Sequence, residues 1–182
     1  MDFLCLDFIN SRWLLVHKPF QERFEDPEWL SGFCAKWDLP LPGAEDIAGL
    51  IEFREFLFAA GSELCRTGEL APDKLDKLNA RLNSVPLENR LECRDGSFHL
   101  TARSNAGGAK WMLYRIALSF AELVTGQPLE KLKQCGNPDC GEIFFDVSKN
   151  QTRKWCDNTC ASLMKVRRFR ADKKEASDAP AT

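Results

Sequence analysis

The chain has 182 residues, of which 44% are hydrophobic, and it carries a formal net charge of -2. That is enough apolar material for one main domain with its own core and a small appendage. Nowhere does an apolar run approach the ~18 residues that a membrane span requires, and the opening residues carry Asp2 and Asp7 without a basic leader. We therefore expect a cytoplasmic protein with no membrane partner, whose cysteines stay reduced unless they bind metal or perform redox chemistry.

Three segments show apolar residues at helical spacing. They are residues 27–38, residues 43–66 and the stretch "APDKLDKLNARLNSVP", which has a proline near its start and ends before Pro86. Arg54 stands where the apolar stripe of the second segment would otherwise continue. The pattern predicts three helices, of which the second is the longest.

The middle of the chain predicts a hairpin followed by another helix. In "LENRLECRDGSFHLTAR" apolar and polar residues alternate on both sides of Asp95-Gly96, a dipeptide suited to a two-residue turn. The next segment, capped by Ser104, is apolar at helical spacing as far as the break at Gly126-Gln127-Pro128. The short opening "FLCLDFINS" favours a third strand or a buried turn.

These elements predict an α+β fold with a boundary near the glycine-proline break. Residues 1–127 would form a mostly helical domain with a small antiparallel sheet, and its role could be that of a sensor or an oligomerisation domain. Residues 128–174 would form a zinc-ribbon-like module that ends in a basic helix. The small polar residues of 175–182 favour a disordered tail.

Four cysteines are paired closely in the sequence, namely Cys135 with Cys140 and Cys156 with Cys160. Two turn-borne pairs joined by a β-rich segment can place four sulfur atoms around one zinc ion. Because four thiolates leave no position for a catalytic water, this zinc would be structural. The alternative is a set of buried or redox cysteines, the pattern shown by the singly scattered residues Cys5, Cys34, Cys65 and Cys93.

The end of the chain is basic although the protein as a whole is slightly acidic. Residues 149–174 hold nine lysines and arginines against Asp157 and Asp172. Part of this charge would offset the -2 of a zinc ion with four thiolates, and the rest suits a phosphate backbone. The predicted nucleic-acid-binding residues are Lys149, Arg153, Lys154, Lys165, Arg167, Arg168 and Arg170, with Asn150, Gln151 and Asn158 as candidates for contacts to bases.

The segment "CGNPDCGEIFFDVSKNQTRKWC", followed by a further cysteine and "KVRRFRA", resembles the bacterial CGNR zinc-finger family. "LCLDFINS" resembles the opening of the ABATE domain that precedes this finger in the family. The resemblance implies a stress-induced transcriptional regulator that binds zinc and DNA. Ala161-Ser162-Leu163 replaces the Gly-Asn-Arg of the family after the last cysteine, a departure that leaves the zinc ligands intact.

Other functions stay open at this point. A zinc-stabilised module for protein interaction, or a redox stress sensor whose thiolates release zinc on oxidation, would carry the same cysteines. Four polar residues near apolar runs of the larger domain could bind a small anionic ligand, namely Asp7, Asn10, Arg54 and Arg103. We expect instead that Asp7 and Arg54 pair with each other.

The sequence does not favour an enzyme. The two histidines, His17 and His99, form no metal-binding pair, and the chain has neither a glycine-rich phosphate loop nor a nucleophile elbow.

Overall fold

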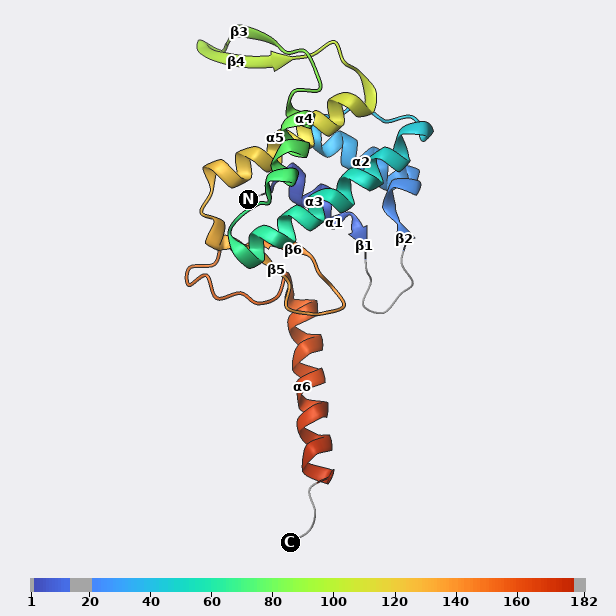
Figure 1. The fold of residues 1–182 in the computed structure, drawn as a ribbon, viewed down its shortest axis with the longest axis vertical. Coiled ribbons are helices and arrows are strands. Elements are labelled where there is room, and N and C mark those ends of the chain that lie inside the picture. Colours follow the sequence, from blue (N-terminus) through green and yellow to red (C-terminus); the bar gives the residue numbers. More distant parts are fainter. Residues whose placement is uncertain (1, 14–20, 179–182) are drawn as a thin grey trace.

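The structure is a computed structural model that describes residues 2–13 and 21–178 (Figure 1). His17 lies outside this part of the chain. The described helices are α1 (Leu4–Asn10), α2 (Pro27–Trp37), α3 (Ile47–Thr67), α4 (Pro72–Leu82), α5 (Gly108–Gly126) and α6 (Asn158–Asp178). The described strands are β1 (Arg12–Trp13), β2 (Gln21–Glu22), β3 (Glu88–Arg94), β4 (Ser97–Arg103), β5 (Leu132–Gln134) and β6 (Ile143–Phe145), and they pair as antiparallel ribbons β1–β2, β3–β4 and β5–β6.

The predicted α+β class is confirmed. Ser104 does not cap α5 as expected, because this helix begins at Gly108 with Gly107 at the N-cap, but α2 begins at a capping residue. The side chain of Asp26 accepts hydrogen bonds from the backbone N–H groups of Glu28 and Trp29, and Pro27 occupies the first helical position of α2. α3 begins a few residues later than expected, because residues 44–46 form a 3-10 turn, and it ends at Gly68 in the left-handed conformation.

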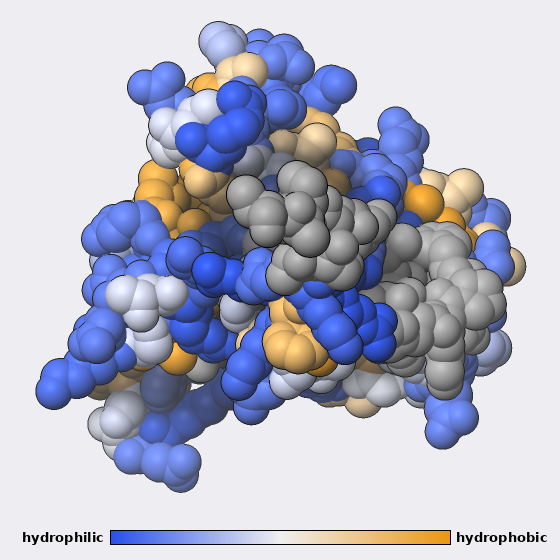
Figure 2. All heavy atoms as spheres, turned by 90° about the horizontal axis from the view of Figure 1, so that it is seen from below, coloured by the Kyte–Doolittle hydropathy of each residue, from blue (hydrophilic) through white to orange (hydrophobic). Residues whose placement is uncertain are grey.

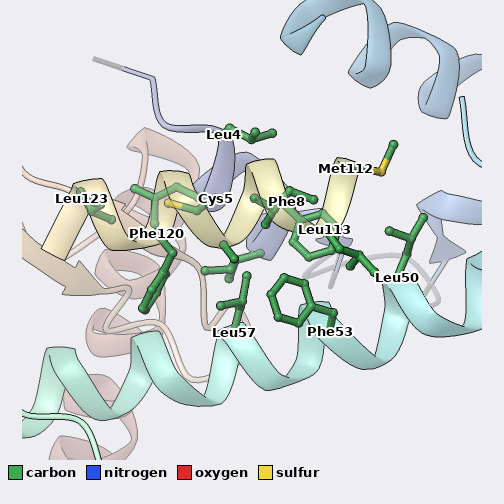
Figure 3. Close-up of a cluster of buried hydrophobic side chains, with 14 of the residues drawn as sticks. Leu4, Cys5, Phe8, Leu50, Phe53, Leu57, Met112, Leu113, Phe120 and Leu123 are labelled. Atoms are coloured by element: carbon green, nitrogen blue, oxygen red, sulfur yellow. The ribbon is translucent and has the colours of Figure 1, made fainter. Parts of the chain in front are cut away.

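The core lies where α1, α3 and α5 meet (Figure 3). Phe8 from α1, Leu57 from α3 and Phe120 from α5 are all fully buried there. The backbone N–H of Cys5 donates to the hydroxyl of Ser119 at 3.2 Å, which joins α1 to α5. Burial raises the pKa of the Cys5 thiol to about 12, so this cysteine stays protonated as a packing residue.

The expectation of a strand or a buried turn at the opening segment is wrong, because residues 4–10 form helix α1. Leu4, Cys5, Leu6, Phe8 and Ile9 are buried around most of its circumference. An α-helix that is buried on nearly all sides lacks a polar stripe, so its sequence reads as a short apolar run. Periodicity therefore could not distinguish it from a buried strand.

The hairpin has the turn that its sequence predicts. Asp95 and Gly96 both have positive φ values, 51° and 76°, as a two-residue turn of this kind requires. Arg94 pairs with Ser97 next to the turn, and the ladder runs without a break to the pair Glu88 and Arg103. The hairpin extends away from the helices at the end of the molecule opposite α6 (Figure 1).

The C-terminal segment shares the core of the helical part. Leu132 from β5 and Ile143 from β6 are buried within the same cluster as α1, α3 and α5. α6 then leaves the body as a single projecting helix (Figure 1) and continues to Asp178, into the segment expected to be a disordered tail. Residues 179–182 lie outside the described part.

Asn10 fastens α1 to β6. Its side-chain amide donates to the carbonyl of Ile143 at 2.7 Å, and its side-chain oxygen accepts from the Ile143 N–H at 3.0 Å. Ile143 is fully buried, so water cannot replace either bond.

We expect Asn10→Ala to lower the free energy of unfolding by about 2–4 kcal/mol, because it leaves two buried backbone groups without partners. Urea unfolding at 25 °C measures the change. Asn105→Ala, a replacement of an exposed asparagine, serves as the control and should stay within about 0.5 kcal/mol of the parent. Equal stabilities of the two variants would contradict the role of Asn10.

Candidate functional site

The four paired cysteines converge at the junction between the body and α6. Cys135 follows β5, Cys140 precedes β6, and Cys156 and Cys160 flank the start of α6. The four sulfur atoms lie within 4.8 Å of one another. The Sγ atom of Cys156 lies 3.6 Å from that of Cys140 and 3.7 Å from that of Cys160. A regular tetrahedron with zinc–sulfur bonds of ~2.3 Å has edges of ~3.8 Å, so the spacing fits one zinc ion.

Local backbone geometry brings the two cysteine pairs together. The N–H of Gly136 donates to the carbonyl of Lys154 at 2.8 Å, which ties the loop of the first pair to that of the second. Gly141 turns the chain after Cys140 with a φ of 70°, a value that favours glycine. The side chain of Asp157 accepts from the Cys160 N–H at 2.8 Å, so Cys160 lies in the capped first turn of α6.

Asp146 holds the loop between the two cysteine pairs. Its fully buried carboxylate accepts hydrogen bonds from the Ser148 hydroxyl at 2.6 Å, the Arg153 backbone N–H at 3.0 Å and the Lys133 ammonium at 2.7 Å. The Asp146 N–H itself donates to the carbonyl of Lys131. The bond from Lys133, followed by those from Ser148, holds the pKa of Asp146 well below its usual range. This carboxylate therefore stays charged at neutral pH.

The thiols differ in how readily they lose a proton. Burial raises the pKa of Cys140 to about 12 and also raises the pKa of Cys156. Burial acts in the same direction on Cys135, but hydrogen bonds from the N–H groups of Cys156 and Asn137 outweigh it and lower the Cys135 pKa. Zinc binds thiolates, so zinc binding displaces the protons that the half-buried thiols of Cys140 and Cys156 otherwise retain.

Asn137 and Arg167 surround the cluster. The fully buried side-chain amide of Asn137 donates to the sulfur of Cys160 at 3.3 Å, and its oxygen accepts from an Arg167 guanidinium nitrogen at 3.4 Å. Arg167 also forms an ion pair with Asp139. These contacts place a positive charge from α6 beside the thiolates and fix the direction in which the helix leaves the cluster.

Comparisons with known families match both halves of the chain. A model described as the CGNR zinc finger matches residues 131–173, and the ABATE model, described as "Putative stress-induced transcription regulator", matches residues 2–127. The chain belongs to the ABATE family. No curated protein matches the chain. Together with the sulfur geometry, the CGNR match assigns the four cysteines to one structural zinc ion.

Ala161-Ser162-Leu163, which replaces the Gly-Asn-Arg of the CGNR motif, lies in the first turns of α6. The Ala161 N–H donates to the Asp157 carbonyl at 3.2 Å, so the replacement continues the helix. A guanidinium still reaches the surroundings of the cluster in this chain, and it comes from Arg167. The departure thus leaves both the four sulfurs and a neighbouring arginine in place.

The predicted nucleic-acid-binding residues divide into two groups. Arg153 lies over the ring of Phe144 and donates to the carbonyl of Cys156, while Arg167 binds Asp139, so these two hold the CGNR finger together. The others are exposed and have no side-chain partner in the described part of the chain, namely Lys149, Lys154, Lys165, Arg168 and Arg170. Viewed from the α6 end, the molecule is mainly hydrophilic (Figure 2).

Two neighbouring hollows lie beside the zinc cluster on the loop before α6. One, of ≈ 500 Å³, is lined by Ser148, Lys149, Asn150, Thr152, Arg153, Lys154 and Trp155. The other, of ≈ 180 Å³, shares Arg153, Lys154 and Trp155 and adds Asp157, Asn158 and Ala161 from the start of α6. Asn150 and Asn158, two of the residues considered for contacts to bases, thus border a basic surface. Gln151 lies on the same loop.

The four residues considered for a small ligand are not brought together. Asp7 and Asn10 line one hollow of ≈ 430 Å³ in the ABATE region. Arg103 lies on the exposed hairpin and pairs with Glu92. Arg54 is buried in α3, apart from this hollow. Of the four, only Asp7 and Asn10 thus line the same hollow, and a ligand site at these residues stays a prediction.

The expected pair between Asp7 and Arg54 is wrong. The carboxylate of Asp7 accepts hydrogen bonds from Lys36 and from the indole N–H of Trp37. Arg54 instead donates two hydrogen bonds of 2.8 Å to Glu22, one to each carboxylate oxygen. Glu22 lies in β2, a strand of only two residues, so no pattern in the sequence marked it as the partner.

Sequence reasoning also missed Asn137 and Asp146. Both are fully buried polar residues, which is uncommon unless they are bonded on several sides. A usable signal was present, because asparagine or aspartate two residues before a hydrogen-bonding N–H often forms a local turn, as Asp146 does with Ser148 at 3.0 Å.

The two matched families are described as a regulator and a zinc finger, not as enzymes. His99, which lies within the described residues, is exposed on β4. Among these residues the helices are too short or too polar to cross a membrane.

Proposed function

We propose that the protein is a bacterial transcription regulator that binds DNA through the zinc-anchored helix α6 and the basic loop before it. One observation carries this proposal. α6 projects from the body with the exposed, unpaired side chains of Lys165, Arg168 and Arg170, while the zinc cluster fixes its first turn.

The dimensions of α6 suit this role. A helix of 21 residues is ~32 Å long, and an α-helix fits the major groove of DNA. Lysine and arginine side chains on an exposed helix attract phosphates and displace their counterions. The contacts of Arg167 with Asn137 and Asp139 would hold the helix in one direction relative to the loop, so that both could reach the same duplex.

The proposal predicts salt-dependent binding that depends on α6. We expect the triple variant Lys165→Ala, Arg168→Ala and Arg170→Ala to bind a random duplex at least tenfold more weakly at low salt. Each lost phosphate contact should reduce the magnitude of the slope of log affinity against log salt by about 1. For the triple variant, the slope should therefore become shallower by roughly 2–3. Fluorescence anisotropy of the zinc-loaded protein at several salt concentrations measures both quantities.

A matched control removes the same amount of charge elsewhere. Arg66, Arg90 and Lys110 are exposed basic residues of the ABATE region, and their replacement by alanine should leave the salt slope unchanged. If both triple variants lose affinity equally, binding follows net charge and not α6. If the parent protein fails to bind at low salt, the DNA-binding proposal is wrong.

A second candidate function rests on two apolar side chains of α6. Val166 and Phe169, one helical turn apart, are 46% and 68% exposed, which is unusual for a helix with purely electrostatic contacts. They favour a helix that docks on an acidic protein with an apolar groove. Replacing both residues by serine would separate the two functions, because non-specific DNA binding should persist whereas docking in a groove should be lost.

A further inference from the structure

The β3–β4 hairpin presents an uncovered apolar face. Leu91 pairs directly with Leu100, and Cys93 pairs with Phe98 in the next position that points the same way. Leu91, Leu100 and Phe98 are 67%, 73% and 74% exposed, values that among the large apolar side chains in the described part of the chain only Phe169, at 68%, matches. Leu87, which immediately precedes β3, is also exposed.

The polar side chains of the hairpin gather on the opposite face. Glu92 forms ion pairs there with Arg94 and Arg103, and Arg90 and His99 lie on the same side by alternation. Apart from Asn89 at the base of the apolar face, the hairpin is divided into an apolar and a polar face, which is typical of a ribbon with one buried side. A two-stranded hairpin is also only marginally stable in water unless another element packs on it. These properties favour a face that another surface covers in solution.

We propose that this surface is the same hairpin of a second copy of the chain. The apolar face contains no charged side chain, so two copies can meet on it without opposing like charges. Its side chains also change in size along the ribbon, from Phe98 near the turn to Ala102 and Asn89 near the base. A two-fold axis across the middle of the ribbon places the Phe98 ring of each copy over the small residues of the other.

In this arrangement the Leu91–Leu100 pairs of the two copies meet at the centre, and Cys93 of each copy faces Asn89 of the other. The hairpin lies at the end of the molecule opposite α6 (Figure 1), so the contact leaves the basic helix free. The face measures roughly 24 Å by 10 Å, or about 480 Å² over both copies, which is well below the area of a stable dimer interface. We therefore expect a weak, reversible dimer with a dissociation constant on the order of 100 μM.

Sedimentation of the zinc-loaded protein without DNA tests the association. Between about 1 and 200 μM the mass should rise from the 20.7 kDa of one chain toward twice that value. The variant Phe98→Thr and Leu100→Thr should stay monomeric, because threonine suits a strand but removes the apolar contact. Replacing Arg90 and His99 by threonine changes the opposite face and should leave the association intact.

A second measurement locates the contact without a substitution. Cys93 is exposed in the single chain and would be covered in the dimer. Its rate of alkylation, followed by mass spectrometry, should therefore fall as the concentration of the parent protein rises and should stay constant in the threonine variant of Phe98 and Leu100. A parent protein that remains monomeric up to about 200 μM overturns the proposal, as does a dimer in which the alkylation rate of Cys93 does not change.

Discussion

Replacing Cys160 by alanine is expected to abolish the binding of one zinc ion per chain and to unfold the segment that holds α6. Structural zinc contributes about 10–16 kcal/mol in zinc-finger peptides at neutral pH, so the loss of one of four thiolates removes a large share of the stability of this segment. Zinc content is measured by elemental analysis and helix content by circular dichroism. Both should fall in the variant.

α6 has little else to stabilise it. From Lys165 to Lys173 its side chains are exposed, and an isolated helix of this length is marginal in water without a packed face. The helices of the ABATE region have their own core around Phe8, Leu57 and Phe120 and should remain folded. We therefore expect a partial loss of helical signal together with a lower melting temperature.

The control replaces Cys93, an exposed cysteine far from the cluster in the sequence, and should leave zinc content and helix content unchanged. A chelator should reproduce the effect of Cys160→Ala on the parent protein. Retention of one tightly bound zinc ion by Cys160→Ala, or of the full helical signal by the chelated parent, would show that the cluster does not anchor α6.

The zinc centre was predictable because its signal is local. Cys135, Cys140, Cys156 and Cys160 stand in two close pairs amid turn residues, a spacing that is typical of structural zinc sites. The helices α2, α3 and α4 were predictable for a similar reason, since their apolar periodicity, and in α2 and α4 a proline at the start, is visible in residues that are close in the sequence. The Asp95-Gly96 turn likewise fixes the hairpin.

What the sequence concealed depends on contacts between distant residues. α1 is buried on nearly all sides by α3 and α5, so no amphipathic pattern marks it as a helix. The division of the basic residues was also hidden, because Arg167 and Arg153 are engaged by Asp139 and the Cys156 carbonyl through the folding of the loop. The charge count alone gave every basic residue the same weight, whereas the structure leaves Lys165, Arg168 and Arg170 free for a partner.

Arg54 provides the clearest test of such a distant contact. The residue is only 1% exposed to solvent. Its guanidinium binds both carboxylate oxygens of Glu22 and also contacts Glu55. Glu22 also accepts a hydrogen bond from the Phe24 N–H at 3.0 Å, and Phe24 packs beneath the guanidinium in the core. The pair therefore fastens β2 and the following turn to α3.

We expect Arg54→Ala to lower the free energy of unfolding by about 3–5 kcal/mol, because it leaves a largely buried carboxylate without its partner. For a chain of this size that corresponds to a decrease in melting temperature of roughly 10 °C. Arg54→Lys keeps the charge but cannot bind both oxygens at once, so it should recover only part of the stability. Urea unfolding of the zinc-loaded protein measures the three stabilities on one scale.

The double variant Arg54→Met and Glu22→Leu separates the charge effect from the loss of packing. Because no unpaired charge remains and only the Phe24 N–H loses its acceptor, the double variant should be more stable than Arg54→Ala by at least about 1 kcal/mol. A loss below about 1 kcal/mol in Arg54→Ala would mean that the ion pair contributes little in solution. A double variant as unstable as Arg54→Ala would instead show that the loss of stability in Arg54→Ala comes from altered packing and not from the unpaired carboxylate of Glu22.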